Sequence, residues 1–174
     1  MIKRWLLLIL IVGPILYFLA FGLTRDPSLL PSALIGKKIP DLALENLDGK
    51  QVSLSSFSGK SLVINFWSTW CGPCMYEHPL LLRASKEYGG KNILFLGIAY
   101  QDDKEEVKAF LKENGEPFTV LLDPKGQAAI QFGVGGVPET FFADTAGIIR
   151  AKHSGVLTPE VLDAKLGLID AGER

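Results

Sequence analysis

The chain has 174 residues, of which 48% are hydrophobic and 21% charged, and its formal net charge is −1. This length allows one ordinary domain plus an extension, and the composition is typical of a packed core, which excludes a chain that is disordered throughout. A net charge near zero provides no basic field for DNA or RNA, so the composition also argues against nucleic-acid binding.

The N-terminal segment differs from the rest of the chain. The 19 residues from Trp5 to Leu23 carry no formal charge, and a helix of that length is enough to cross the apolar core of a bilayer. Lys3 and Arg4 precede the segment, and positive charge on that side predicts a cytoplasmic N-terminus with the rest of the chain beyond the membrane. Residues 1–25 are therefore predicted to be a single transmembrane anchor.

Two alternatives exist for this anchor. A cleaved signal peptide has a shorter apolar stretch and small residues before the cut, a pattern that Ala20-Phe21-Gly22 fits only loosely. A buried core helix that is apolar on every face needs a larger soluble domain around it. We favour the uncleaved anchor. Residues 26–36, which include two prolines and two serines, are predicted to be a tether to a domain over residues 37–174.

The domain is predicted to begin with a β-hairpin. Residues 42–47 and 51–54 alternate between apolar and polar, and Asp48-Gly49 between them is a turn dipeptide. A polar turn or short helix follows at 55–59. Residues 61–67 are almost all apolar, which predicts a buried strand.

The pentapeptide Trp70-Cys71-Gly72-Pro73-Cys74 comes directly after this strand and opens a predicted helix over 72–88 that Pro79 should bend. A cysteine at a helix N-terminus faces unpaired backbone N–H groups and the positive end of the helix dipole, which favour the thiolate. Cys71 is therefore predicted to attack a partner disulfide, and Cys74, one turn deeper, to attack the mixed disulfide that results.

Other interpretations of the two cysteines are weaker. A structural zinc site usually needs four ligands, and beyond this pair the chain offers only His78 and His153. Haem attachment needs a histidine where Met75 stands, and a peroxidatic cysteine would have a proline in place of Ile64. A purely structural disulfide would close too short a loop to stabilise the fold much. Redox chemistry is favoured, with no metal and no cofactor beyond the cysteine pair.

The rest of the chain alternates between predicted strands and helices. Residues 92–99 form a continuous apolar run typical of a central buried strand, and Asp103 is a suitable cap for the helix that follows. The further predicted elements are a helix at 104–114, a strand at 118–122, a short helix at 126–132, strands at 139–143 and 148–153, and a last helix opened by Thr158-Pro159-Glu160. This order predicts a three-layer α/β/α domain around a mixed sheet.

Residues 61–79, with the CGPC motif and a proline five places after its second cysteine, resemble the thioredoxin superfamily. More narrowly, the anchor, Gly97-Ile-Ala-Tyr100 followed by Gln-Asp-Asp, and the run 133–141 resemble the CcmG/DsbE thiol:disulfide interchange proteins. The resemblance covers roughly residues 35–168. It implies a thioredoxin-like fold and a redox-active Cys71–Cys74 disulfide.

The resemblance also implies a role and partners. Proteins of this family are periplasmic reductants, held in the bacterial inner membrane, that act in cytochrome c biogenesis. The expected client is apocytochrome c or a cytochrome c maturation protein, and the expected electron donor is a membrane thiol-electron transporter. Two alternatives stay open: a general extracytoplasmic thiol reductase of the TlpA or ResA kind, and a non-catalytic module that holds apocytochrome.

Several site residues are carried over by the resemblance. Val137-Pro138 should be a cis peptide against the disulfide, with the backbone of Val137 available to a bound strand; a trans proline that begins the next strand is the alternative. Asn65 replaces the aspartate that ordinary thioredoxins bury beneath the thiols. Glu77 and Glu139 are therefore the candidates for the acid/base that serves Cys74, and a solvated surface glutamate is the alternative for each.

Aromatic and histidine side chains near the motif complete the expectations. Trp70 is predicted to offer an exposed apolar contact to a partner, and Trp67 to belong to the core. Tyr100 could line the partner groove, although a tyrosine at a strand end is more often simply packed. His78 and His153 are both interpreted as surface histidines rather than catalytic ones.

Overall fold

The structure is a computed structural model, and it describes residues 2–23, 33–89, 92–116 and 118–170. The chain divides into two compact units, Met1–Pro31 and Ser32–Arg174. In the first unit, helix α1 spans Ile2–Leu23 and contains Pro14. Among the described residues, no helix combines the length and the hydrophobicity needed to span a membrane.

That result leaves the anchor at residues 1–25 as a prediction. The side chains of residues 1–9 and 22–25 lie outside the described part of the chain, as do residues 26–32 of the predicted tether. From residue 10 to residue 21, all side chains of α1 are exposed.

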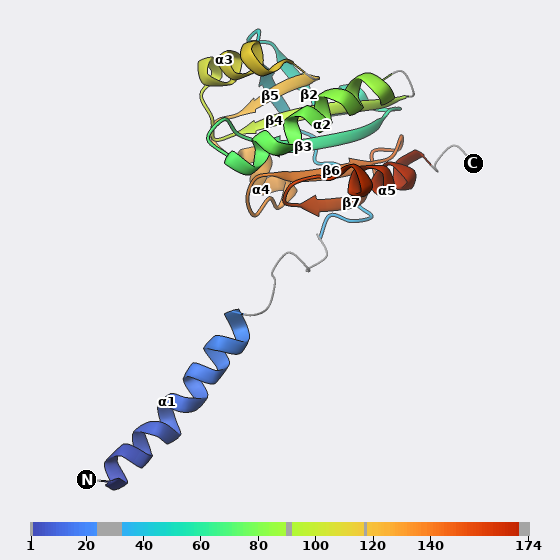
Figure 1. Cartoon of the computed structure of the whole chain (residues 1–174). Helices are drawn as coiled ribbons and strands as arrows, with labels where there is room; N and C mark the ends of the chain where they lie inside the picture. The colour runs from blue at the N-terminus through green and yellow to red at the C-terminus, as the bar shows by residue number, and fades with distance from the viewer. Residues whose placement is uncertain (1, 24–32, 90–91, 117, 171–174) are drawn as a thin grey trace. The chain divides into compact units, whose positions relative to one another are not determined.

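The described residues of the second unit form a seven-stranded mixed sheet (Figure 1). Its order is β2-β1-β5-β4-β3-β6-β7, with parallel pairing among β3, β4 and β5 and antiparallel pairing elsewhere. The strands are β1 (Ala43–Asn46), β2 (Gln51–Ser53), β3 (Ser61–Trp67), β4 (Ile93–Tyr100), β5 (Thr119–Asp123), β6 (Glu139–Ala143) and β7 (Ile149–Ser154). The predicted hairpin is β1–β2, and β4 is the central strand.

Helices cover both faces of the sheet, as predicted for a three-layer α/β/α domain. The helices are α2 (Gly72–Tyr88), α3 (Lys104–Asn114), α4 (Gln127–Phe132) and α5 (Pro159–Asp170), with a 3₁₀ turn η2 (Leu54–Phe57) after the hairpin. Side chains alternate between the two faces of the sheet along β3, so neighbouring residues show which helices cover each face. Val63 packs in a cluster with residues of α2 and α5, whereas Ile64 packs with residues of α4 and η2. Residues of α3 pack with Trp67, on the face of Val63.

The predicted elements are confirmed, with small shifts at their ends. All seven residues of β3 are buried, as expected for a strand covered on both faces. The predicted strand 92–99 begins one residue later because Asn92 has a left-handed backbone, φ 62°. The predicted strand 118–122 instead ends at Asp123, whose carboxylate accepts a hydrogen bond from Ala129 N at 2.9 Å in the following helix.

Residues close to both described ends of this unit form hydrogen bonds at the end of the sheet where β3 begins. At the N-terminal end, Gly36 N donates to Ile149 O at 2.8 Å and Ile39 N donates to Gly147 O at 2.9 Å. At the C-terminal end, Ser61 Oγ donates to Ile169 O at 3.1 Å. Ser61 is the first residue of β3, and the cysteines follow its last residue.

Candidate active site

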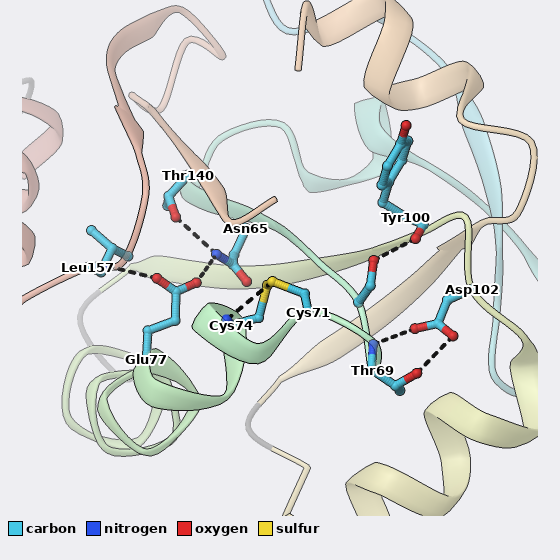
Figure 2. The surroundings of a disulfide bond; sticks show 10 residues. Asn65, Thr69, Cys71, Cys74, Glu77, Tyr100, Asp102, Thr140 and Leu157 are labelled. Atoms are coloured by element: carbon cyan, nitrogen blue, oxygen red, sulfur yellow. Dashed lines mark hydrogen bonds between the residues drawn. A yellow bond between two sulfur atoms is a disulfide. The ribbon is translucent and has the colours of Figure 1, made fainter. Parts of the chain in front are cut away.

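A disulfide joins Cys71 and Cys74, with an S–S distance of 2.08 Å, at the junction of β3 and α2 (Figure 2). Cys71 is the N-cap of α2, and its Sγ accepts a hydrogen bond from Cys74 N at 3.2 Å. Both residues are buried, at 4% and 2% exposure. The pair lies at the start of the helix, where backbone N–H groups stabilise a thiolate.

The loop that presents Cys71 is tied to the end of β4. The Asp102 carboxylate accepts hydrogen bonds from Thr69 N at 2.6 Å and from Thr69 Oγ1 at 3.0 Å. Ser68 Oγ donates to the backbone oxygen of Tyr100 at 2.6 Å. These bonds link two loops that leave neighbouring parallel strands, as Figure 2 shows, and they fix the backbone before the first cysteine.

A second loop, residues 133–138, leads into β6, which pairs with β3 on the side opposite β4. Its Val137–Pro138 peptide is cis, as the family resemblance implied, so the trans alternative is wrong. Val137 packs against the cluster that holds both cysteines. The cis peptide precedes β6, and its Val137 side chain packs near the cysteines.

Glu77 is buried one helical turn after Cys74, at 1% exposure, so the interpretation as a solvated surface residue is wrong. Its carboxylate accepts hydrogen bonds from Leu157 N at 2.7 Å and from Asn65 Nδ2 at 2.8 Å. Burial raises the pKa of Glu77 above its ordinary value, although these two hydrogen bonds oppose that rise. Among the described residues, no cationic side chain pairs with it.

Asn65 connects this glutamate to the sheet. Its amide nitrogen also donates to Thr140 Oγ1 at 3.0 Å, so it joins α2 to β3 and β6. The side chain lines a small cavity together with Cys74, Trp67 and His78. A neutral amide and Cys74 therefore line the same cavity, and this amide is hydrogen-bonded to the buried carboxylate of Glu77.

Glu139 is also buried, at 6% exposure, and again the interpretation as a surface residue is wrong. Unlike Glu77, it forms an ion pair, because Lys152 Nζ lies 2.7 Å from Glu139 Oε2. Ser154 Oγ donates to Glu139 Oε1 at 2.9 Å. Its charge is therefore balanced by a lysine from β7.

The two tryptophans occupy the predicted environments. Trp67 belongs to the core at 4% exposure, whereas Trp70 is 59% exposed and its Nε1 donates to Gln101 O at 3.2 Å. Tyr100 is half-buried, packs against a core cluster and contacts Trp70 with ring centroids 6.3 Å apart. Tyr100 is therefore packed, and a role of this side chain in partner binding stays a prediction.

Both histidines were expected at the surface, and the structure contradicts this for His78. His78 is buried at 8% exposure, its Nε2 lies 3.0 Å from Gly115 O, and its ring contacts Phe110, so the surface interpretation is wrong. His153 is partly exposed, with Nε2 3.1 Å from Val156 O. Across the described ranges, His, Cys, Asp and Glu side chains form no group of three or more suited to a metal ion.

Comparison with known proteins identifies the family. The family model described as Redoxin matches residues 34–166 of the chain. The chain belongs to the Redoxin family. Among curated relatives, the thiol:disulfide interchange protein DsbE of Escherichia coli K12 is 38% identical over 180 residues, covering 94% of this chain and 92% of its own. HelX of Rhodobacter capsulatus, another thiol:disulfide interchange protein, is 37% identical and covers 85% of this chain and 84% of its own.

A solved structure supports the same assignment. A crystal structure of a protein described as the thiol:disulfide interchange protein DsbE from Chlorobium tepidum matches with a TM-score of 0.72 and 29% identity, covering 78% of this chain and 97% of its own. This Redoxin-family chain is thus a DsbE-type, CcmG-like protein with a thioredoxin-like fold, and it is a thiol:disulfide oxidoreductase.

Glu77 was a candidate from the sequence, whereas its burial, the burial of His78 and the contacts of Asp102 and Lys152 at this Redoxin-family site were not predicted. Glu77 and His78 follow Cys74 by three and four residues, and together with Leu81 and Ala84 they form the buried face of α2, so helical periodicity was a usable signal. In the sequence, Asp102 stands out only as part of the Gln-Asp-Asp motif, and nothing indicates its bonds to Thr69. Lys152 gives no signal, because its partner Glu139 lies on another strand.

Proposed function

We propose that this chain is a membrane-anchored periplasmic reductant that acts during cytochrome c biogenesis, with apocytochrome c or a maturation protein as its client. The observation that carries the proposal is the Cys71–Cys74 disulfide at the N-terminus of α2, next to a cis-proline loop. The DsbE and HelX relatives support the same type of thiol exchange.

The exchange begins with the reduced protein. The Cys71 thiolate attacks one sulfur of the client disulfide, which forms a Cys71–client disulfide and releases the other client sulfur as a thiolate that takes up a proton. The Cys74 thiolate then attacks Cys71 Sγ and releases the second client thiol. Two electrons pass from the cysteine pair to the client, and the pair ends as a disulfide.

Glu77 is the acid/base that serves Cys74 in this scheme. Cys74 is buried, so its thiol proton must leave before it can attack, and a buried carboxylate one turn away is a suitable acceptor. A raised pKa makes the Glu77 carboxylate a better base than an exposed glutamate. Glu139, which is paired with Lys152, serves instead to hold its loop.

The chain needs a source of two electrons for each turnover, which a membrane thiol-electron transporter would supply through its own cysteine pair. An N-terminal anchor would keep the protein beside such a donor. The exposed apolar side chains on α1 support this arrangement, and they include Leu10, Leu16, Tyr17 and Phe18. The positive charges of Lys3 and Arg4, which precede the apolar segment 5–23, support a periplasmic domain.

Trapping of mixed disulfides tests the client. In living cells, Cys74→Ser should arrest the exchange at the Cys71–client disulfide, so that an apocytochrome or a maturation protein is captured and identified by mass spectrometry. Cys71→Ser is the matched control and should capture no client through the attacking position. Capture of unrelated envelope proteins alone would indicate a general thiol reductase of the TlpA or ResA kind.

Complementation tests the catalytic role itself. In a strain that lacks this protein, neither Cys71→Ser nor Cys74→Ser should restore covalent cytochrome c. Full activity of both variants would show that the protein holds apocytochrome without redox chemistry. Labelling of intact cells with a thiol reagent that does not cross the inner membrane tests the location, because a periplasmic Cys71 should react and a cytoplasmic one should not.

A further inference from the structure

The loop at residues 133–138 leads into β6 and packs near the disulfide through Val137. Val137 packs against the cluster that contains Cys71 and Cys74. Among the described residues, none forms a hydrogen bond with the backbone N–H or C=O of Val137. Unpaired groups of this kind can bind a second chain in the manner of a sheet edge. The position of this loop therefore determines how well an extended polypeptide can lie across the sulfurs.

A lysine from the neighbouring strand holds both ends of this loop. Lys152 Nζ donates to Gly133 O, the first residue of the loop, at 3.2 Å. The same nitrogen lies 2.7 Å from an oxygen of Glu139, the residue that follows the loop. The side chains of Lys152 and Glu139 are only 16% and 8% exposed, so solvent screens their attraction little.

The surrounding contacts restrict this lysine further. Its ammonium group lies 5.3 Å from the centre of the Phe141 ring. The Glu139 carboxylate, in turn, accepts a hydrogen bond from Ser154 Oγ at 2.9 Å and one from Gly135 N, in the middle of the loop, at 3.4 Å. The loop is thus fastened at its start, its middle and its end by one ion pair.

We propose that Lys152 is a positioning residue for polypeptide recognition, which acts by holding residues 133–138 so that the backbone of Val137 can pair with an extended client. The inference rests on the proposed thiol exchange. Lys152 does not contact the sulfurs, so it affects chemistry only through this loop. Its loss should therefore weaken exchange with polypeptide disulfides and spare exchange with small disulfides that have no backbone.

The experiment compares two substrates for the reduced full-length chain. One is a synthetic peptide with an intramolecular Cys-Ala-Ala-Cys disulfide flanked by extended segments, and the other is bis(2-hydroxyethyl) disulfide. Lys152→Met should lower kcat/KM for the peptide about tenfold, through KM, while the rate with the small disulfide changes less than about twofold. Lys152→Arg should restore the peptide rate, because a guanidinium can donate to both the carbonyl and the carboxylate.

Arg150 offers a matched control on the same strand. Its guanidinium lies 2.6 Å from an oxygen of the buried Asp144 at the other end of the β6–β7 hairpin, so Arg150→Met also removes the partner of a buried carboxylate, but away from the loop. Arg150→Met should leave both rates unchanged. The inference is overturned if Lys152→Met reduces the peptide as fast as the wild type, if it loses both substrates equally, or if Arg150→Met shows the same split.

The small disulfide also separates this inference from the proposed function. A wild-type protein that reduces neither substrate would contradict thiol exchange itself, and with it the ground for the inference. A wild type that reduces both, with a Lys152→Met variant that retains the small-disulfide rate, demonstrates that the variant is folded and active. Any loss confined to the peptide then belongs to recognition.

Discussion

Glu77 and Glu139 are both buried near the disulfide, and they differ in how their charge is balanced. Glu77, on α2, accepts hydrogen bonds from a backbone N–H and from the neutral amide of Asn65. Glu139, at the start of β6, lies 2.7 Å from the ammonium group of Lys152. The Glu77 carboxylate is therefore stabilised by neutral hydrogen-bond donors, whereas the Glu139 carboxylate is stabilised by the positive charge of Lys152.

This difference separates two roles that look alike in the sequence. Burial without a counter-charge raises the pKa of Glu77, so this group exchanges protons closer to neutral pH than an ordinary glutamate does. The ion pair makes Glu139 a fixed anchor for the loop before it. The function of each glutamate is therefore indicated by the group that it pairs with, and less by its distance along the chain from the cysteines.

The sharpest test of the comparison is Glu77→Gln. Loss of the proton acceptor should slow release of the second client thiol about 100-fold at neutral pH, within the range of general acid–base catalysis. The wild-type rate should fall as the pH drops through the raised pKa of Glu77, and the variant should lack this inflection. Single-turnover rates across a pH series measure both effects. An unchanged pH profile in Glu77→Gln would exclude Glu77 as the base.

Glu139→Gln should have its main effect on stability. The substitution removes the counter-charge of the partly buried Lys152 ammonium group, which should lower the free energy of unfolding by about 1–3 kcal/mol. Urea unfolding of the oxidised protein measures the loss. The pH profile of thiol release should keep its wild-type shape, and loss of the inflection in this variant would reverse the assignment of roles.

Asn65→Asp would place a second carboxyl group against Glu77. Because like charges disfavour ionisation of both, the inflection in the rate profile should move to higher pH. Thr140→Ser, which keeps the hydroxyl that Asn65 contacts, is a control and should leave the inflection in place. An inflection that stays at the wild-type pH in Asn65→Asp would mean that the two carboxyl groups do not interact.

The smallest expected effect is on the pH dependence of stability. The pKa of Glu77 is raised in the folded state, so its contribution is fully present below the unfolded-state pKa and is lost as the pH rises through the folded-state value. The wild type should therefore lose stability relative to Glu77→Gln as the pH increases towards neutral. Urea midpoints of both proteins over a pH series test this, and a difference that grows in the opposite direction would contradict it.

Much of the fold could be predicted from the sequence because its signals are local. The apolar run before the cysteines, the Asp48-Gly49 turn and the capping residue Asp103 each specify a nearby element, and all three were found as expected. The cis peptide at Val137-Pro138 followed from the family resemblance rather than from local physics.

The partners of the site residues could not be predicted in the same way. Lys152 reaches Glu139 only because β6 and β7 pair with Phe141 opposite Lys152 and Glu139 opposite Ser154, a register that no local pattern specifies. Burial of Glu77 depends likewise on Leu157, which is 80 residues further along the chain. Two acids near a redox motif therefore looked equivalent until these long-range contacts were known.

The hydrogen bond that joins the end of α5 to the start of β3 has a practical consequence. The sulfurs follow the last residue of that strand, so a full strand length, about 20 Å, separates them from the hydrogen bond between Ser61 and Ile169. A fusion partner or an immobilising tag joined beyond α5 would therefore be attached at the end of β3 opposite the sulfurs, which favours that position for assays with large folded substrates.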